Sequence, residues 1–520
     1  MNSTNLNTNP PSSLPEGSPG LSFPLREFVL LLGILLGYIL ITLTLWGKFE
    51  PHYDTPGYTD PAISFLMGKG FTSGCWYLQG NREFWAGNVP LHQLLLIPWF
   101  KLAGFSYLSV KLLNSIYLSL GMILLWLGMR SGRLVNSPGL RIGAISFFLL
   151  TDSAYILGTT GRPEPLCLLI ACAGWYFLNG RRNVLRWGGL VLCGALAPWA
   201  GLPLAAFFAF AGLGTVLIYQ KRYFREVLAL AVGGVAGTIA LLLFYRSAGV
   251  LEIFFANISP HTSFLAGNKA HQTAAYVEWA KYVDSWVWKT GGFLSISLFW
   301  TALISAGVSL TALITSQAKK LAAVNIGCFT LLPILFHLAG VFPNYYSFYI
   351  LLPLTFSLFG LIAAGVISNR VIHRIVMVLL VIGVFLPGGY LWTAIVQGVP
   401  SYRSPERESR EEFIKKSVHP DDVAWVDRRF WFETKPVARE TFSALWRLQA
   451  ETSSSRKEIT VVIVPESSAE DSGRFLLPIL PGHWEKTGES LQLPDFHRLI
   501  RSNKNNPPIS FFVYRKVEPK

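Results

Sequence analysis

The stretch Val227-Leu-Ala-Leu-Ala-Val-Gly-Gly-Val-Ala-Gly-Thr-Ile-Ala-Leu-Leu-Leu-Phe244 decides the fold, because it holds no charged side chain. An α-helix rises about 1.5 Å per residue, so this stretch nearly matches a hydrocarbon core about 30 Å thick. Lipid offers no hydrogen-bond partner to the backbone, so a spanning segment of this kind must be helical. Similar apolar runs occupy Phe28–Trp46 and Ile375–Ala394. The sequence therefore predicts several transmembrane helices.

The composition agrees with this interpretation over the whole length. The 520 residues are 51% hydrophobic and only 14% charged, with a mean hydropathy of +0.41, whereas soluble proteins carry about 25% charged residues. Residues 401–520 hold 20 Lys/Arg and 18 Asp/Glu, so most of the net charge of +14 lies before residue 401. The excess falls in short turns between apolar runs, which is typical of cytoplasmic loops. It does not indicate a nucleic-acid-binding surface.

Placing the apolar runs end to end predicts an α-helical polytopic membrane protein with about eleven transmembrane helices. The expected spans are 27–46, 107–129, 142–158, 164–180, 187–200, 202–219, 226–245, 291–315, 321–341, 346–368 and 375–396. Prolines at 198 and 203 leave the count around 187–219 open by one.

The charges also predict an orientation. If the N-terminus is cytoplasmic, the short basic turns all fall inside, as the positive-inside rule requires. Nine of the twelve acidic residues before residue 401 then lie in or beside outer segments, which places the working face outside. Residues 1–24 read as a disordered cytoplasmic tail, because they are rich in Asn, Ser, Pro and Gly. Two long outer loops, 47–106 and 246–290, interrupt the transmembrane domain of residues 25–399.

The composition changes after residue 399. Residues 400–520 are expected to form a small α/β domain, with helices over 410–417 and 435–451 and strands over 422–426, 459–464 and 509–517. An odd number of spans places this domain on the extracytoplasmic side. Within the first outer loop, residues 90–101 are apolar but too short to span, and they predict an amphipathic helix at the membrane surface.

The first outer loop carries the sequence Asp54-Thr-Pro-Gly-Tyr-Thr-Asp60, followed by Gly68-Lys-Gly-Phe71. An acid just after the first span, then Gly-Tyr and a Gly-x-Gly-Phe turn, resembles the GT-C superfamily of glycosyltransferases that use polyprenyl-phosphate sugars. This group includes protein O-mannosyltransferases and aminoarabinose transferases. The resemblance implies that Asp54 is the catalytic base, with Asp60 in reserve. The alternative is that Asp54 merely caps a helix that begins near Pro56.

Further residues of the resemblance are expected to bind the donor. Arg162, in Gly161-Arg-Pro-Glu-Pro165, offers a guanidinium fork for phosphate, and Glu164 would orient it. The alternative is an interfacial ion pair at a helix start. Asp152 is a candidate because a carboxyl group within a span is costly. Tyr345 and Tyr346, which precede a late span, would contact phosphate through their hydroxyls, or belong only to the aromatic belt.

Outer-loop cations complete the expected donor site. Lys69, Arg82 and His261 are candidates for neutralising a phosphate near the surface. The sequence shows no metal-ligand spacing, so we assign no metal ligands, although some relatives of the superfamily use a divalent cation. Motifs for nucleotide binding, for Ser hydrolases and for zinc proteases are absent from the sequence.

The sequence therefore predicts an inverting glycosyltransferase of the cell envelope, in a bacterial inner or plasma membrane. It would move a sugar from a polyprenyl-phosphate donor to a lipid, glycan or protein acceptor on the extracytoplasmic side. The main alternative is a secondary transporter or lipid flippase, but such proteins bind their ions near the bilayer midplane. A non-catalytic scaffold is the third possibility.

Overall fold

The structure is a computed structural model of the 520-residue chain. It describes residues 24–44, 54–76, 82–132, 134–180, 184–219, 222–262, 294–315, 318–338, 346–385, 406–443, 458–465, 480, 482–493 and 509–517. The predicted N-terminal tail (except for residue 24) and most of the loop 246–290 lie outside these residues.

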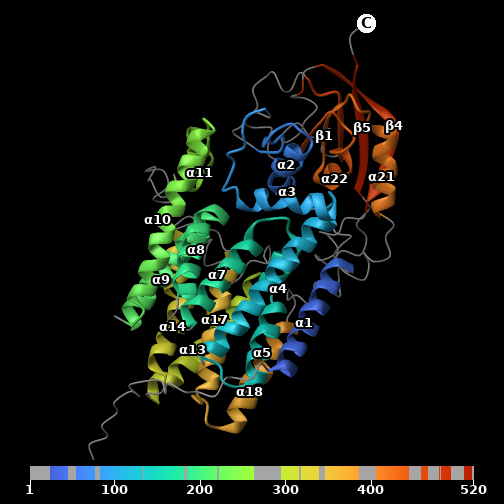
Figure 1. Ribbon diagram of the computed structural model, residues 1–520. Helices are drawn as coiled ribbons and strands as arrows, with labels where there is room; N and C mark the ends of the chain where they lie inside the picture. The colour runs from blue at the N-terminus through green and yellow to red at the C-terminus, as the bar shows by residue number, and fades with distance from the viewer. Residues whose placement is uncertain are drawn as a thin grey trace, which may run out of the picture.

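A bundle of long helices forms the main body of the molecule (Figure 1). A helix occurs in every one of the runs predicted to span. The helices are α1 (Leu25–Thr44), α4 (Tyr107–Ser131), α5 (Pro138–Leu149), α6 (Asp152–Thr159), α7 (Glu164–Asn179), α8 (Val184–Ala200), α9 (Leu202–Tyr219), α10 (Phe224–Ser247), α13 (Leu294–Ile314), α14 (Lys319–Phe329), α15 (Leu331–Leu338), α17 (Phe348–Ala363) and α18 (Arg370–Phe385).

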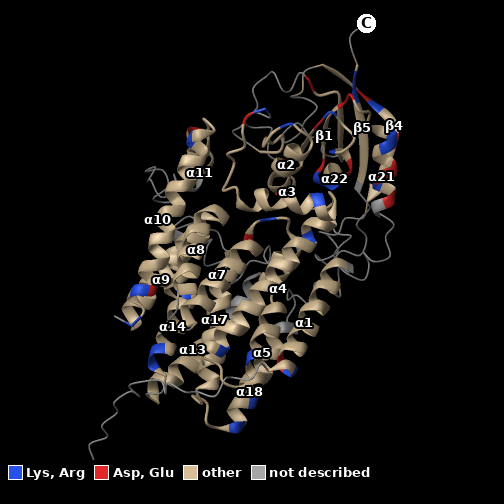
Figure 2. Cartoon of the chain, in the orientation of Figure 1, with Lys and Arg blue, Asp and Glu red and all other residues tan. Residues whose placement is uncertain are grey.

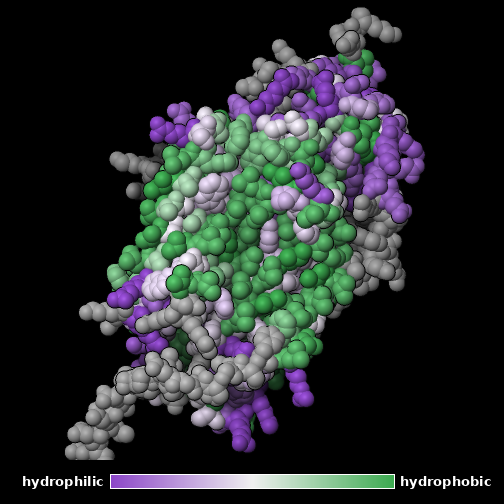
Figure 3. Space-filling view, viewed as in Figure 1, coloured by the Kyte–Doolittle hydropathy of each residue, from purple (hydrophilic) through white to green (hydrophobic). Residues whose placement is uncertain are grey.

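The bundle meets the requirements of an integral membrane protein. Within the described residues, five segments are long and apolar enough to cross a bilayer: 25–43, 107–131, 202–219, 224–247 and 319–336. Five shorter apolar helices accompany them, so the count of eleven spans remains a prediction. Figure 3 shows a broad hydrophobic band over the bundle with hydrophilic surface beyond both ends. In Figure 2 the charged residues gather at those same two ends.

Three short helices stand at one end of the bundle. They are α2 (Thr55–Leu66), α3 (Leu91–Ala103) and α11 (Leu251–Thr262). Helix α3 confirms the helix predicted over residues 90–101, and Figure 1 shows it lying across the bundle rather than along it. Gly68 and Gly70 follow α2 with φ angles of +77° and +78°, a conformation that only glycine adopts easily. The Gly-x-Gly pattern therefore turns the chain sharply after α2.

The C-terminal part is an α/β domain, as predicted. Its five-stranded sheet has the order β2-β1-β3-β5-β4. Strand β1 pairs in parallel with β2 and β3, whereas β5 pairs antiparallel with β3 and β4. Its elements are α21 (Glu406–Ser417), β1 (Val423–Val426), η4 (Arg428–Phe430), α22 (Trp431–Thr434), β2 (Glu440–Ser443), β3 (Val461–Pro465), β4 (His483–Leu493) and β5 (Ile509–Val517).

The helix predicted over residues 435–451 is wrong where the structure describes it. Residues Glu440–Ser443 form the edge strand β2. Parallel pairing with β1 and burial of Phe442 stabilise the strand, and these tertiary contacts outweigh the local helical pattern. Strand β4 was missed because its residues are mostly exposed and strongly polar.

The C-terminal domain sits on the end of the bundle that carries α2 and α3 (Figure 1). The ring of Phe105, just after α3, stacks on Phe432 with centroids 5.3 Å apart, and Tyr107 lies 5.5 Å from the same ring. One continuous core includes both the buried bundle residues and Phe413, Phe430 and Trp431 of the domain. The C-terminal domain therefore packs directly on the segment that links α3 to α4.

Candidate active site

The Gly161-Arg162-Pro163 turn is the centre of the candidate site. It connects α6 to α7 at the bundle end that faces the C-terminal domain. A Cβ atom on Gly161 would lie 2.2 Å from the Cγ2 atom of Thr55, so only glycine permits α2 to come this close. The Thr55 hydroxyl accepts a hydrogen bond from the Gly161 backbone N–H at 3.2 Å. The start of α2 is thus fixed directly against the turn that carries Arg162.

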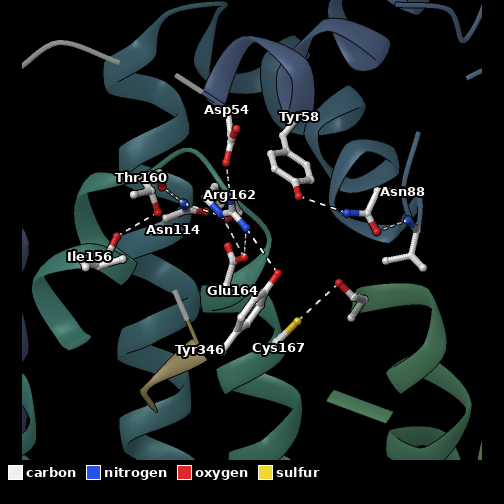
Figure 4. Close-up of polar contacts among 12 residues, drawn as sticks. Asp54, Tyr58, Asn88, Asn114, Ile156, Thr160, Arg162, Glu164, Cys167 and Tyr346 are labelled. Carbon is white, nitrogen blue, oxygen red and sulfur yellow. Dashed lines mark hydrogen bonds and ion pairs between the residues drawn. The ribbon is translucent and has the colours of Figure 1, made fainter. Parts of the chain in front are cut away.

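The Arg162 guanidinium binds two carboxylates at once (Figure 4). Its Nε and one Nη donate to Glu164 Oε1 at 3.0 and 2.8 Å, and the other Nη pairs with Asp54 Oδ2. The Tyr346 hydroxyl lies 3.4 Å from the same guanidinium. The side chains of Arg162 and Glu164 are only 6% and 3% exposed, whereas that of Asp54 keeps 17%. Asp54 is therefore the member of the cluster that solvent or a substrate can reach.

Asp54 occupies the N-cap position of α2, yet its side chain makes no capping hydrogen bond. The carboxylate turns instead toward Arg162, 108 positions later in the chain. Pro56 lies in the first turn of α2, where a missing N–H costs nothing. The helix start is thus formed without help from the Asp54 carboxylate, which pairs with Arg162 instead.

Tyr58 forms one wall of the site and was not among the predicted residues. Arg162 lies 5.2 Å from the centre of its ring, and Asn88 donates to its hydroxyl at 3.0 Å. The ring also meets Trp76 edge-to-face at 5.3 Å. The quoted Gly-Tyr pair was a signal for Tyr58, whereas nothing in the sequence linked Asn88 to it.

Asn114 was also missed. From the interior of α4 it donates to the carbonyls of Thr160 and Arg162, at 2.5 and 3.3 Å. It is fully buried, and an amide within a predicted span is a signal that the sequence did offer. Asn114 positions the turn rather than touching the site itself.

Burial and charge act against each other on the Asp54 carboxyl. Burial raises its pKa, and the neighbouring Glu164 carboxylate adds to this, while Arg162 opposes the shift through its charge and its hydrogen bond. The net result is a pKa above the usual Asp value. Burial also raises the pKa of Tyr58 well above its ordinary value, so that phenol stays protonated. A carboxyl group with a raised pKa beside a fixed cation is a recurrent feature of catalytic sites.

The structure does not bring the other predicted residues into this cluster. Asp60 is fully buried and pairs with Lys435 of the C-terminal domain at 2.5 Å. Lys69 donates to the Arg439 carbonyl, and the exposed Arg82 lies 3.9 Å from Glu458. Asp152 begins α6 and His261 lies in α11, but their side chains, and Tyr345 altogether, fall outside the described residues.

A metal ion has no ready ligand set at this cluster. Among the residues that the structure describes, no three His, Cys, Asp or Glu side chains come together. Asp54 and Glu164 face each other across Arg162, so the guanidinium already supplies the positive charge between them. The donor set therefore does not fit a divalent cation.

Comparison with known proteins gives a match in structure only. No family model matches the sequence, and no curated protein matches it either. Among solved structures, that of ArnT from Cupriavidus metallidurans bound to undecaprenyl phosphate is similar, with a TM-score of 0.57 and 12% identity. The match covers 94% of this chain and 98% of that one. This chain has the GT-C fold.

A second similar structure supports the assignment of the GT-C fold. It is the oligosaccharyltransferase of Archaeoglobus fulgidus in complex with Zn and sulfate, with a TM-score of 0.50 and 11% identity over 84% of this chain and 68% of that one. The predicted superfamily resemblance is thereby confirmed at the level of the fold. In this GT-C fold, the Asp54–Arg162–Glu164 cluster lies where the start of α2 meets the turn between α6 and α7.

Proposed function

We propose that this chain is an integral membrane glycosyltransferase that takes a sugar from a polyprenyl-phosphate donor. The observation that carries the proposal is the buried Asp54–Arg162–Glu164 cluster at the end of a GT-C bundle where α2 packs. The similarity to ArnT, whose structure contains undecaprenyl phosphate, supports a lipid of this class as the carrier. The acceptor would be a lipid, glycan or protein hydroxyl that enters from the extracytoplasmic side.

The proposed reaction is a single displacement at the anomeric carbon. The acceptor oxygen attacks that carbon and forms the new C–O bond, while its proton moves to Asp54 Oδ. The bond between the anomeric carbon and the phosphate oxygen breaks, and its electron pair leaves with the polyprenyl phosphate. Attack opposite the leaving group inverts the anomeric configuration. A phosphate leaves without protonation, so one base suffices.

Arg162 would exchange one of its partners during this reaction. In the structure, the guanidinium of Arg162 donates hydrogen bonds to both Asp54 and Glu164. A lipid phosphate that binds the Nη facing Asp54 would take over that hydrogen bond and release Asp54 to accept a proton. Charged pairs of guanidinium and phosphate are strong and directional. The Tyr346 hydroxyl, 3.4 Å from the guanidinium, would donate to the same phosphate.

The distribution of carboxylates favours this function over transport. Asp54 and Asp60 belong to the start and the middle of α2, which stands at the bundle end that carries the C-terminal domain (Figure 1), and Arg162 joins Asp54 to Glu164 there. Glu27 and Glu226 pair with Arg141 and Arg186 toward the opposite end. An ion-coupled transporter would instead hold its ionisable groups near the midplane.

The test is sugar transfer by the purified chain in lipid vesicles that contain labelled polyprenyl-phosphate sugars. Asp54→Asn removes the base and keeps the shape, and we expect transfer to fall by about 10²–10⁴-fold. The matched control is Glu252→Gln, which alters an exposed carboxylate on α11 and should transfer as well as the wild type. Wild-type rates in the Asp54→Asn variant would refute the assignment of the base.

A further inference from the structure

Among the described carboxylates of the first outer loop, Asp60 is the most completely buried. It lies within α2, just before Pro61, with no exposed surface. Its Oδ2 accepts hydrogen bonds from the Gly74 N–H at 2.6 Å and the Ser73 hydroxyl at 3.0 Å, and its Oδ1 accepts one from Ser64 at 3.3 Å. These bonds close the loop 60–74 on itself, but they do not neutralise the negative charge.

The neutralising charge comes from the C-terminal domain. The Lys435 ammonium group, between α22 and β2, lies 2.5 Å from Asp60 Oδ1 and 3.3 Å from the Ser64 hydroxyl. The Lys435 side chain is only 5% exposed. Moving a charge out of water is unfavourable, so two opposite charges buried together need each other as partners.

Two further contacts hold the loop 60–74 against the same part of the C-terminal domain. Lys69 donates to the Arg439 carbonyl, directly before β2. Gly74 packs against Phe442 so closely that an added Cβ would lie 3.0 Å from its ring. The domain surface made by Lys435, Arg439 and Phe442 therefore contacts both ends of the loop 60–74.

We infer that Lys435 is a positioning residue for the active site: by neutralising Asp60 it holds α2, and with it Asp54 and Tyr58, against Arg162. The inference rests on the proposed function and extends it to a residue about 380 positions away from the base. Asp54 and Asp60 are six residues apart on one short helix, a rise of about 9 Å. A displacement of about 1 Å in a catalytic group can cost about 100-fold in rate, so loosening this end of α2 would misplace the base.

The experiment compares four variants of the full-length chain in vesicles with labelled polyprenyl-phosphate sugar. Lys435→Met leaves a buried charge on Asp60, and Asp60→Asn/Lys435→Met removes both charges while keeping the shapes. Lys435→Arg keeps the positive charge. Lys416→Met is the control, because that lysine is 65% exposed in a pair with Glu412. The readouts are kcat, KM for the donor, and amide hydrogen exchange of residues 54–66.

Lys435→Met should lower kcat by about 10–100-fold with KM nearly unchanged, because the base is misplaced while Arg162 remains. Exchange over 54–66 should become faster, while exchange over α4 stays the same. The double variant should recover at least tenfold in kcat, since a pair removed together leaves no unpaired charge. Lys435→Arg should recover part of the loss, and Lys416→Met should match the wild type.

Two results would overturn the inference. One is wild-type kcat and exchange in Lys435→Met. The other is an equal loss in the single and double variants, which would assign Lys435 to domain folding alone. If the wild type itself transfers no sugar, the proposed function fails, and the exchange data for residues 54–66 still decide whether Lys435 holds α2.

Discussion

The Arg162 guanidinium lies at the centre of the cluster. The carboxylates of Asp54 and Glu164 and the phenols of Tyr58 and Tyr346 lie around it. Burial raises the pKa of Asp54 and Glu164 raises it further, while Arg162 restrains the increase. A base works only when deprotonated, so a raised pKa moves the acid limb of the activity profile to higher pH.

The pH dependence of transfer is therefore a test of the base. We expect kcat/KM to fall with decreasing pH through a pKa above the usual Asp value of about 3.9. Arg162→Lys keeps a positive charge but loses the rigid fork, so less restraint remains on the Asp54 carboxyl. In the Arg162→Lys variant, the residual activity should therefore fall on the acid side at a higher pH than the activity of the wild type does. An acid limb that stays in place, or moves to lower pH, would contradict the role of Asp54.

At this scale the sequence named four residues of the cluster but not their pairing, and it missed Tyr58 and Asn114. The motif and the resemblance singled out Asp54, Arg162, Glu164 and Tyr346. That Asp54 and Arg162 form an ion pair is a contact between positions 108 apart, which no local pattern encodes. Asp60 was kept in reserve for Asp54 in the sequence, because only the folded chain brings Lys435 to Asp60.

The Thr55–Gly161 hydrogen bond joins helix α2 to the 160–163 turn, and Asn114 joins that turn to α4. The close approach depends on Gly161. Gly161→Ala would place a Cβ 2.2 Å from Thr55 Cγ2, so α2 must move away from the turn. We expect at least a tenfold loss of transfer, because the base moves with α2.

A second substitution makes the Gly161 prediction specific. Thr55→Ser removes the Cγ2 atom but keeps the hydroxyl that accepts from Gly161, so Gly161→Ala/Thr55→Ser should recover activity. Gly139→Ala is the control, because its nearest neighbour would be 3.9 Å away. Equal loss in the single and double variants would show that this contact does not position the site.

Elements were predicted best where one strong local signal defines them. Long apolar runs fixed the helices of the bundle, and Pro90 fixed the approximate start of α3. The single run predicted over 142–158 is divided at Leu150 and Thr151 into α5 and α6. Strand β2 escaped prediction because its stability comes from β1 and from the first outer loop, both distant in sequence.

In the whole molecule, the candidate site lies where α2 meets the end of the bundle, and the C-terminal domain packs on the same α2. Hydropathy predicted the bundle, and the change of composition predicted the domain boundary. Neither pattern could predict that the domain packs on the first outer loop, since that contact depends on side chains such as Phe105 and Phe432. The predicted orientation, with the N-terminus inside and the C-terminal domain outside, places the site where lipid-linked sugars meet extracytoplasmic acceptors.

This orientation can be tested by labelling single cysteines with a membrane-impermeant reagent in intact cells. All five native cysteines are buried, so background labelling should be low. Glu485→Cys, on an exposed part of β4, should react from outside, whereas Lys319→Cys, at the start of α14, should react only after lysis. The reverse pattern would place the domain and the site in the cytosol and remove the proposed donor from reach.

The most direct measurement is a cryo-EM map of the chain in nanodiscs with polyprenyl phosphate added. The account predicts phosphate density within hydrogen-bonding distance of Arg162 and Tyr346, with the Asp54 carboxylate released from the guanidinium and facing the open site. Phosphate density elsewhere, beside an intact Asp54–Arg162 pair, would contradict it.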